Sequence, residues 1–295
     1  MMIITVASGK GGTGKTTVAV NLALSLMEAP KEREGKKLVF ADCDVEEPNA
    51  ALFLNPRFDR REAASIMMPE IDEELCTHCG RCAEVCQYNA IAVVEKKVLV
   101  FEDLCHGCGS CTLQCPEGAI HEVPHTIGQV EQGCVDSMIF VHGMMDIGVP
   151  LAPPIIRKVK EWVIDEDDGE TEQLVILDAP PGTACPVVEA LHGSDYGLMV
   201  TEPTPFGLHD LRVAVQVARD ELGIPVGVVI NRDGVGDTGV EDYCRENDIS
   251  ILMRIPLERR IAEAYSDGES MVSAFPEYRA RFLALYHRIL KEVTP

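Results

Sequence analysis

The sequence predicts a doubly wound α/β fold with a mostly parallel sheet and a small inserted α+β domain. Three observations support this prediction. Short apolar segments alternate with helical patterns, a glycine loop separates the first strand from the first helix, and the alternation stops where the cysteines gather. The 295 residues, 46% of them hydrophobic, suffice for one large core and one small module.

The N-terminal segment predicts a βαβ unit, which is how a parallel sheet begins. We expect a strand over residues 3–7, a helix from 16 to about 28 and a strand over 37–41. The apolar start follows no basic region and stops early at glycine, so it suits a buried strand better than a signal peptide. We therefore expect a cytoplasmic protein.

The α/β pattern breaks off after Asn55-Pro56 and resumes beyond about Pro124. Three parts follow, namely a first part of the α/β domain, an insert and a second part, at residues 1–65, 66–124 and 125–295. The second part predicts three further strands and a helix, over residues 174–177, 196–201, 226–231 and 208–221.

The C-terminal stretch 277–293 has apolar residues at helical spacing, with Arg and Lys between them. We expect a helix that packs on the sheet. A helix on a membrane surface is the alternative, but the apolar face lacks tryptophan and no stretch of the chain is long enough to span a bilayer. We therefore expect no membrane partner.

Residues 9–16 match G-x-x-x-x-G-K-[ST], the phosphate-binding loop of P-loop NTPases, directly after a strand and before a helix. The backbone N–H groups of such a loop surround the phosphates, with Lys15 at the terminal phosphates and Thr16 on magnesium. We assign the nucleotide contacts to Gly11, Gly12, Thr13, Gly14, Lys15, Thr16 and Thr17.

The same letters also satisfy G-x-G-x-x-G, so a dinucleotide-binding loop is the alternative. A Rossmann fingerprint has no use for the Lys15-Thr16-Thr17 run that follows. Its acidic residue should come about 20 residues on, whereas Asp42 and Asp44 lie farther along the chain. The loop therefore favours ATP or ADP.

The 12 cysteines, in a chain without an export signal, favour metal ligation or redox chemistry over disulfides. Eight of them form two runs spaced C-x-x-C-x-x-C-x-x-x-C. In two-cluster bacterial ferredoxins the fourth cysteine of each run binds the other cluster. We expect one [4Fe-4S] cluster on Cys76, Cys79, Cys82 and Cys115, and a second on Cys105, Cys108, Cys111 and Cys86.

Zinc is the alternative for these cysteines, although zinc sites usually use two separated C-x-x-C pairs per ion. The insert thus predicts a ferredoxin-like domain. One departure is Gln87, which replaces the proline expected after Cys86 and puts the local turn in doubt.

The formal charge of −22 would repel a phosphate backbone, so nucleic acid is not an expected partner.

An early lysine in the loop, Lys10, gives the chain a resemblance to the deviant Walker A family, which includes MinD, ParA, the Mrp-type iron-sulfur carriers and the nitrogenase iron protein. The match continues in switch I at residues 42–49, in switch II at 178–182 and in Asn231 at a strand end. With its insert, the chain looks like the MinD-superfamily ATPases of anaerobic bacteria and archaea that contain a ferredoxin domain.

The resemblance implies a dimer that encloses two nucleotides and hydrolyses ATP. Lys10 would reach the phosphates of the opposite subunit, and Asp44 would orient the attacking water. Asp178 would hold magnesium through water, and Asn231 would contact adenine. Phosphoryl transfer needs such positioning and charge neutralisation more than covalent chemistry.

Two functions follow from joining both modules in one chain. The first is an ATPase in which nucleotide-driven rearrangement of a homodimer, or of a dimer with a paralogue, controls electron transfer or the delivery of a metallocluster to a client protein. The second is a positioning or regulatory switch like MinD, whose clusters are structural or sense redox state.

A third metal site is also expected. Cys185 follows Asp178 by seven residues, and a cysteine at this offset in the nitrogenase iron protein ligates a cluster that bridges two subunits. Cys134 is the candidate second ligand, which would give four thiolates per dimer. The alternative is that both are small buried hydrophobic residues.

Overall fold

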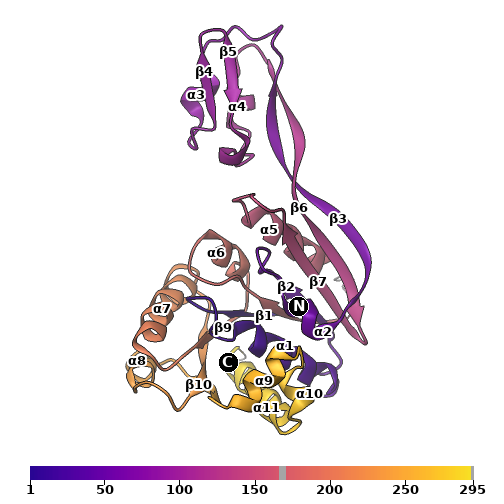
Figure 1. Ribbon diagram of the computed structural model, residues 1–295, viewed down its shortest axis with the longest axis vertical. Coiled ribbons are helices and arrows are strands. Elements are labelled where there is room, and N and C mark those ends of the chain that lie inside the picture. Colours follow the sequence, from indigo (N-terminus) through magenta and orange to yellow (C-terminus); the bar gives the residue numbers. More distant parts are fainter. Residues whose placement is uncertain (166–170, 294–295) are drawn as a thin grey trace.

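The computed structural model describes residues 1–165 and 171–293. In this part of the chain, nine strands form one sheet in the order β11-β10-β9-β1-β8-β2-β7-β6-β3 (Figure 1). Their bounds are β1 Met2–Ala7, β2 Lys37–Asp42, β3 Arg57–Ile71, β6 Ile120–Val135, β7 Met138–Met145, β8 Gln173–Asp178, β9 Tyr196–Thr201, β10 Val226–Asp233 and β11 Ile251–Pro256.

The strands from β11 to β7 are parallel, and β6 pairs antiparallel with both β7 and β3. Helices cover both faces, and each face has its own large core. One core contains α1 Lys15–Met27, α2 Ala50–Leu54, α10 Met271–Ala274 and α11 Glu277–Val293. The other contains α5 Pro153–Asp165, α6 Cys185–Leu191, α7 Pro205–Val215 and α8 Gly239–Glu246. The expected doubly wound, mostly parallel fold is confirmed.

Several expected elements differ at their ends. The helix expected over 208–221 is α7 followed by the π-helical segment η2 Gln216–Glu221. The strand expected over 226–231 continues to Asp233 as β10. Helix α9, Arg259–Ser266, precedes α10. The C-terminal helix α11 packs on the sheet as expected, with Phe282 and Ile289 fully buried. Within the described residues, none of the helices has the length and apolar character needed to cross a membrane.

Strands β3 and β6 form a long two-stranded ribbon, paired from Arg57 opposite Cys134 to Ile71 opposite Ile120. Only their lower halves lie in the sheet, because β6 pairs with β7 no farther than Gly128. The expected boundaries at 66 and 124 fall inside these continuous strands, so the three-part division stays a prediction. Sequence reasoning did not anticipate the ribbon.

The ribbon carries residues 72–119 away from the main body (Figure 1). This segment contains the antiparallel pair β4 Ile91–Val94 and β5 Lys97–Val100, and the short helices α3 Arg81–Val85, η1 Glu102–Leu104 and α4 Ser110–Leu113. Because β3 is parallel to β7, the ribbon leaves the sheet at the carboxyl ends of the parallel strands. That edge is also where the glycine loop follows β1.

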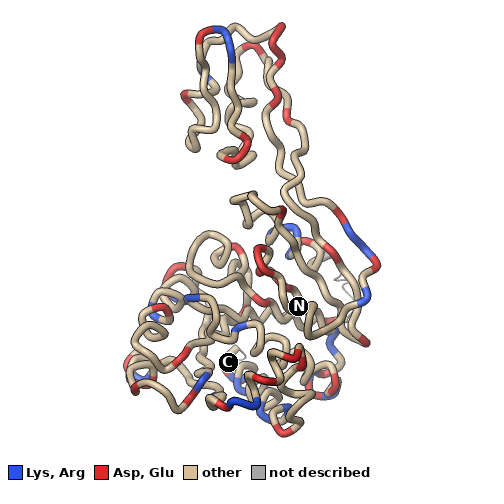
Figure 2. Tube along the Cα trace, viewed as in Figure 1, with Lys and Arg blue, Asp and Glu red and all other residues tan. Residues whose placement is uncertain are grey.

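Polar and cation–π contacts hold the base of the ribbon against α5. The Lys158 ammonium donates to the Ala63 carbonyl oxygen at 2.8 Å, and the Arg60 guanidinium lies 3.9 Å from the centroid of the Trp162 ring. Acidic residues are spread over the ribbon, the segment that it carries and the main body (Figure 2).

Candidate functional site

The phosphate-binding loop runs from Ser8 to Gly14 between β1 and α1. Gly14 has φ 91° and precedes the helix without any side-chain cap. The first N–H groups of α1 are therefore not capped by a side chain, as an anion-binding helix start requires. Parallel strands gather ligands at their carboxyl ends, and this loop lies at that edge beside Asp42 and Asp178.

The structure brings three of the predicted catalytic residues together. Lys15 is buried, and its ammonium lies 3.0 Å from Asp178 Oδ1 and 3.6 Å from Asp44 Oδ2. Burial lowers the Lys15 pKa, but the nearby carboxylates of Asp178, Asp44 and Asp42 outweigh it and hold that pKa above its usual value. Lys15 is thus a charged residue held in place before any phosphate arrives.

Around Lys15, the carboxyl groups of three aspartates outnumber the single ammonium group. Burial, and then the charge of Asp178, raise the pKa of Asp42 to about 8. Burial also raises the pKa of Asp44 to about 6. The second carboxylate oxygen of Asp178 is buried and has no hydrogen-bond partner among the described residues. A divalent cation would satisfy that oxygen and offset the excess, so the residues present fit magnesium.

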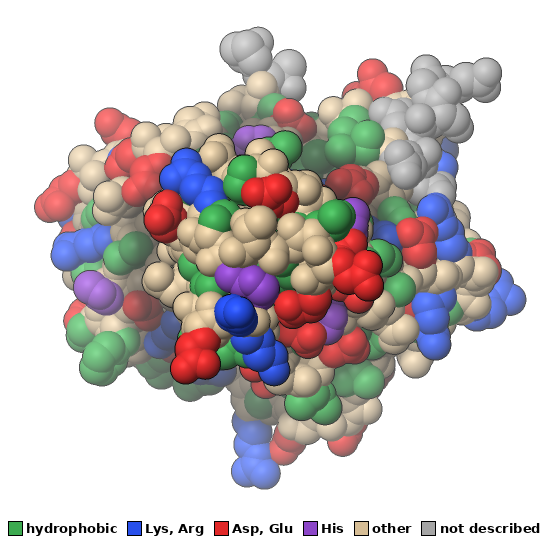
Figure 3. Space-filling model, turned by 90° about the horizontal axis from the view of Figure 1, so that it is seen from above, with side chains coloured by type: hydrophobic (Ala, Val, Ile, Leu, Met, Phe, Trp, Pro, Cys, Tyr) green, Lys and Arg blue, Asp and Glu red, His purple; other side chains and the backbone are tan. Residues whose placement is uncertain are grey.

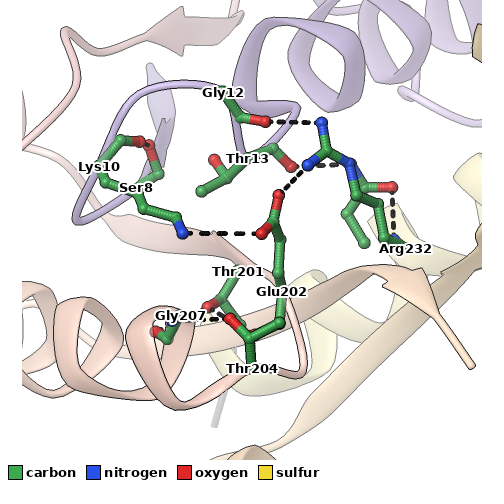
Figure 4. Close-up of polar contacts among 10 residues, drawn as sticks. Ser8, Lys10, Gly12, Thr13, Thr201, Glu202, Thr204, Gly207 and Arg232 are labelled. Atoms are coloured by element: carbon green, nitrogen blue, oxygen red, sulfur yellow. Dashed lines mark hydrogen bonds and ion pairs between the residues drawn. The ribbon is translucent and has the colours of Figure 1, made fainter. Parts of the chain in front are cut away.

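Lys10 lies away from this group and pairs with a residue that sequence reasoning missed. Its ammonium is 3.6 Å from Glu202 Oε2, at the end of β9 (Figure 4). The other oxygen of Glu202 accepts from Arg232, which also donates to the Gly12 carbonyl oxygen at 3.1 Å. Glu202 follows the expected strand 196–201, so its place at a carboxyl strand end is the signal that could have found it.

Asn231 contacts the loop itself in this structure. Its amide donates to the Thr13 carbonyl oxygen at 2.7 Å. Beside it opens a cavity of about 350 Å³, lined by the loop and by residues of α1, β10, β11, α9 and α10, namely Gly12, Gly14, Thr17, Asn231, Arg232, Ile255, Pro256, Leu257, Glu258, Ile261, Ala262, Tyr265, Ser266 and Met271. It is large enough for a nucleoside next to the phosphate loop.

A row of ionisable residues crosses five strands at the level of this site. In register, Arg61 lies opposite Glu131, Glu131 opposite His142, and His142 beside Asp42, which lies beside Asp178. Paired residues share one face of a sheet. Glu131 is buried between Arg61 and the His142 ring, whose Nε2 is 3.0 Å from Glu131 Oε2. The row joins the ribbon base to the phosphate site.

The eight insert cysteines line two small cavities of about 20 Å³ each. The first cavity contains Cys76, Cys79, Cys82 and Cys115. The second contains Cys86, Cys105, Cys108 and Cys111. These are the two sets expected from the spacing, each with its fourth cysteine from the other run. Burial raises the thiol pKa of Cys82 and Cys111, which a bound metal would reverse.

The backbone around the two cavities repeats after 29 residues, the separation of Cys76 from Cys105. Left-handed φ angles occur at matching places, 59° at His78 and 63° at Gly107. The Ala90 N–H donates to Cys86 Sγ at 3.2 Å, and the Ala119 N–H donates to Cys115 Sγ at 3.3 Å. Gln87 therefore does not disturb its turn.

Such N–H groups stabilise thiolates, so the donor set fits iron-sulfur cubanes. Among the described residues, no three His, Cys, Asp or Glu side chains converge as the ligands of a single metal ion. A cubane does not require such convergence, because each thiolate binds a different iron.

The structure does not bring Cys134 and Cys185 together. Cys185 is exposed and begins α6, just beyond switch II. Cys134 lies opposite Ile139, which pairs with Val39 near the start of β2. Because β6 runs antiparallel to β7, Cys134 lies near the amino ends of the parallel strands. This is about 10 Å along the strand direction from Asp42, which lies at their carboxyl ends. This corrects the expected Cys134–Cys185 pairing, whereas a bridging role for Cys185 stays a prediction.

Fold and loop together define the class, a P-loop nucleotide-binding protein with a mostly parallel α/β sheet. The profile of the CobQ/CobB/MinD/ParA nucleotide binding domain matches residues 4–271. The chain belongs to this family, which confirms the MinD- and ParA-like assignment.

Relatives and solved structures agree with this assignment. An uncharacterized protein of Methanocaldococcus jannaschii is 32% identical over 274 residues, 92% of each chain. An iron-sulfur cluster carrier protein of the same organism is 23% identical and covers 98% of this chain and 84% of its own length. The septum site-determining protein MinD of Pyrococcus horikoshii, complexed with Mg-ADP, has a TM-score of 0.59 at 20% identity, over 99% of this chain and 97% of that one.

Proposed function

We propose that this protein binds and hydrolyses ATP as a dimer, and that its nucleotide cycle acts on two [4Fe-4S] clusters held by a ferredoxin-like insert. One observation carries the proposal. Each of the two insert cavities is lined by three cysteines of one run and the fourth of the other. Two-cluster ferredoxins use this crosswise arrangement, and the bound clusters supply one-electron transfer at low potential.

On the nucleotide side, we give the predicted residues the roles that the family resemblance implies. Lys15 exchanges its carboxylate partners for the terminal phosphates, and Thr16 binds magnesium, which Asp178 holds through water. Asp44, buried beside Lys15, orients the attacking water. Lys10 reaches the phosphates of the other subunit. The Mg-ADP complex of the MinD protein supports the choice of nucleotide and cation.

The proposed coupling uses the ribbon. Its strands belong to the same sheet as β2 and β8, and the row from Arg61 to Asp178 crosses from one to the other. Near the second cysteine set, Cys105 and His106 line a cavity together with Val149 and Leu151 from the loop after β7. A rearrangement at the phosphate site therefore has two physical routes to the insert.

The proposed partners follow from the surface. Seen from the insert end, acidic side chains predominate, and basic ones occur in small separate groups (Figure 3). We propose a client protein with a basic docking surface that accepts electrons or a metallocluster. The dimer forms with a second copy or with a paralogue.

Anaerobic purification, metal analysis and EPR of the reduced protein with and without MgATP test the proposal together. We expect iron and sulfide near eight atoms per chain, and an EPR signal or potential that MgATP shifts. Zinc without sulfide would overturn the cluster assignment. If MgATP changes only the oligomeric state and leaves the clusters unaltered, the MinD-like positioning switch becomes the better description.

A further inference from the structure

Glu202 is a buried carboxylate that bridges two cations beside the phosphate loop. Its side chain is 11% exposed, while that of its partner Lys10 is 33% exposed. Figure 4 shows Lys10 and Arg232 approaching it from two sides, one from the loop and one from the end of β10. The resemblance assigns Lys10 to the opposite subunit's phosphates, yet in this single chain its charge is satisfied within its own subunit.

The backbone that carries Glu202 is fixed. Its carbonyl oxygen accepts from the Thr204 N–H at 2.8 Å, and a Cβ at Gly207 would collide with that oxygen. Thr204 caps α7 by accepting from the Gly207 N–H at 3.1 Å, and Thr201 donates to the Gly207 carbonyl oxygen at 2.9 Å. The carboxylate therefore stands on a rigid turn between β9 and α7.

Lys10 is the movable partner. Its carbonyl oxygen accepts from the Ser8 hydroxyl at 2.8 Å, so the backbone is held. Its ammonium is on a four-carbon stem, and its contact to Glu202 is a single ion pair without a short hydrogen bond. The two ends of this ion pair thus differ, because the lysine can leave while Glu202 stays and keeps Arg232.

We propose that Glu202 is a positioning residue that holds Lys10 against its own subunit until a nucleotide-loaded partner offers phosphate oxygens in exchange. This inference rests on the proposed trans role of Lys10. Each subunit must break one such pair when the dimer forms, so Glu202 sets how readily ATP drives pairing. Because Glu202 keeps Arg232, and Arg232 keeps the Gly12 carbonyl, the loop retains its shape during the exchange.

The test measures ATPase rate and sedimentation against protein concentration for wild type, Glu202→Gln, Lys10→Ala and the double variant. In Glu202→Gln we expect half-maximal pairing with MgATP at a roughly tenfold lower protein concentration, because two partly exposed ion pairs no longer need breaking. The maximal rate per site should stay unchanged. In the Lys10→Ala background the same change should have no effect on pairing.

Several outcomes would overturn the inference. An unchanged or higher concentration for Glu202→Gln, or the same shift in the Lys10→Ala background, would mean that Glu202 only supports the loop. Glu202→Asp, whose shorter arm cannot reach both cations, should shift pairing in the same direction and serves if the glutamine variant does not fold. Asp242→Asn, which breaks the Asp242–Arg245 ion pair on α8, is the control. Wild type that never pairs with ATP would instead refute the proposed function.

Discussion

The main body and the insert differ in the interactions that stabilise them. The body buries two large apolar cores, one on each face of its sheet. The insert has one small core, in which Cys82 and Cys111 accompany Ile91, Val98 and Ile120. Domains of this size usually need metals or disulfides for stability. The comparison teaches that the nucleotide site forms from packing alone, whereas the insert depends on what its cysteines bind.

The largest expected effect is on the nucleotide side. Lys15→Ala should weaken ATP binding by at least about 100-fold, because a buried cation is lost and three carboxylates are left to face the phosphates. Calorimetric titration with MgATP measures this. The insert should keep its iron content, and a parallel loss of iron would show that the two regions do not fold independently.

The next effect is confined to the insert. Cys82→Ser should remove one cluster and expose the amides of residues 72–119 to hydrogen exchange, while nucleotide affinity stays within about twofold. Iron analysis and exchange mass spectrometry give both readouts. Cys244→Ser is the control, since Cys244 is also buried but lies in the body. Unchanged exchange in the insert would contradict the difference between the regions.

A smaller effect concerns how the free energy of unfolding of the main body depends on pH. In nucleotide-free protein the folded pKa of Asp42 is raised from 3.8 to about 8, so the folded state binds that proton more tightly than the unfolded state. This contribution stabilises the fold at low pH and is lost as pH rises toward 8, by at most about 1.4 kcal/mol per pH unit. Denaturant titrations should show a weaker pH dependence in Asp42→Asn.

Magnesium sharpens this test. A bound cation lowers the proton affinity of nearby carboxylates, so MgADP should reduce the wild-type slope of unfolding free energy against pH. A slope that is equal in wild type and Asp42→Asn would show that Asp42 is not the group responsible.

The last prediction is that one cysteine substitution has no effect on the iron content. Cys134→Ala should leave the iron content unchanged, because Cys134 lies at the edge of the sheet opposite the phosphate site. Cys185→Ala is the informative counterpart. If Cys185 alone binds metal at the dimer axis, only its substitution removes iron in excess of eight atoms per chain.

The sequence sufficed for features that are encoded locally. The glycine loop and the cysteine runs are contiguous motifs, so Lys15 and the two cysteine sets could be assigned before any fold was known. The Lys10–Glu202 contact could not be assigned in this way, because the two residues are distant in sequence and sheet order brings them together. Cys134 was misplaced for the same reason, since strand direction decides which edge a residue occupies.

The ribbon was missed because its two strands look unlike ordinary strands. Residues 57–63 of β3 are all exposed, and alternation of buried side chains begins only at Ala64, Ile66 and Met68. The base therefore lacks the alternation of apolar residues that would predict a strand. The pairing of Arg61 with Glu131 and His142 is likewise a matter of register between distant segments.

The same ribbon has the geometry of a lever arm. Beyond Ala64 and Gly128 it has no neighbour in the sheet and extends about 20–25 Å at the rise of a β-strand. A tilt of about 5° at its base would move its tip by about 2 Å, while every bond inside the segment that it carries stays as it was. A small change in the angle of the ribbon at its base therefore becomes a displacement of its tip. A docked client would be brought nearer or withdrawn without refolding of either protein.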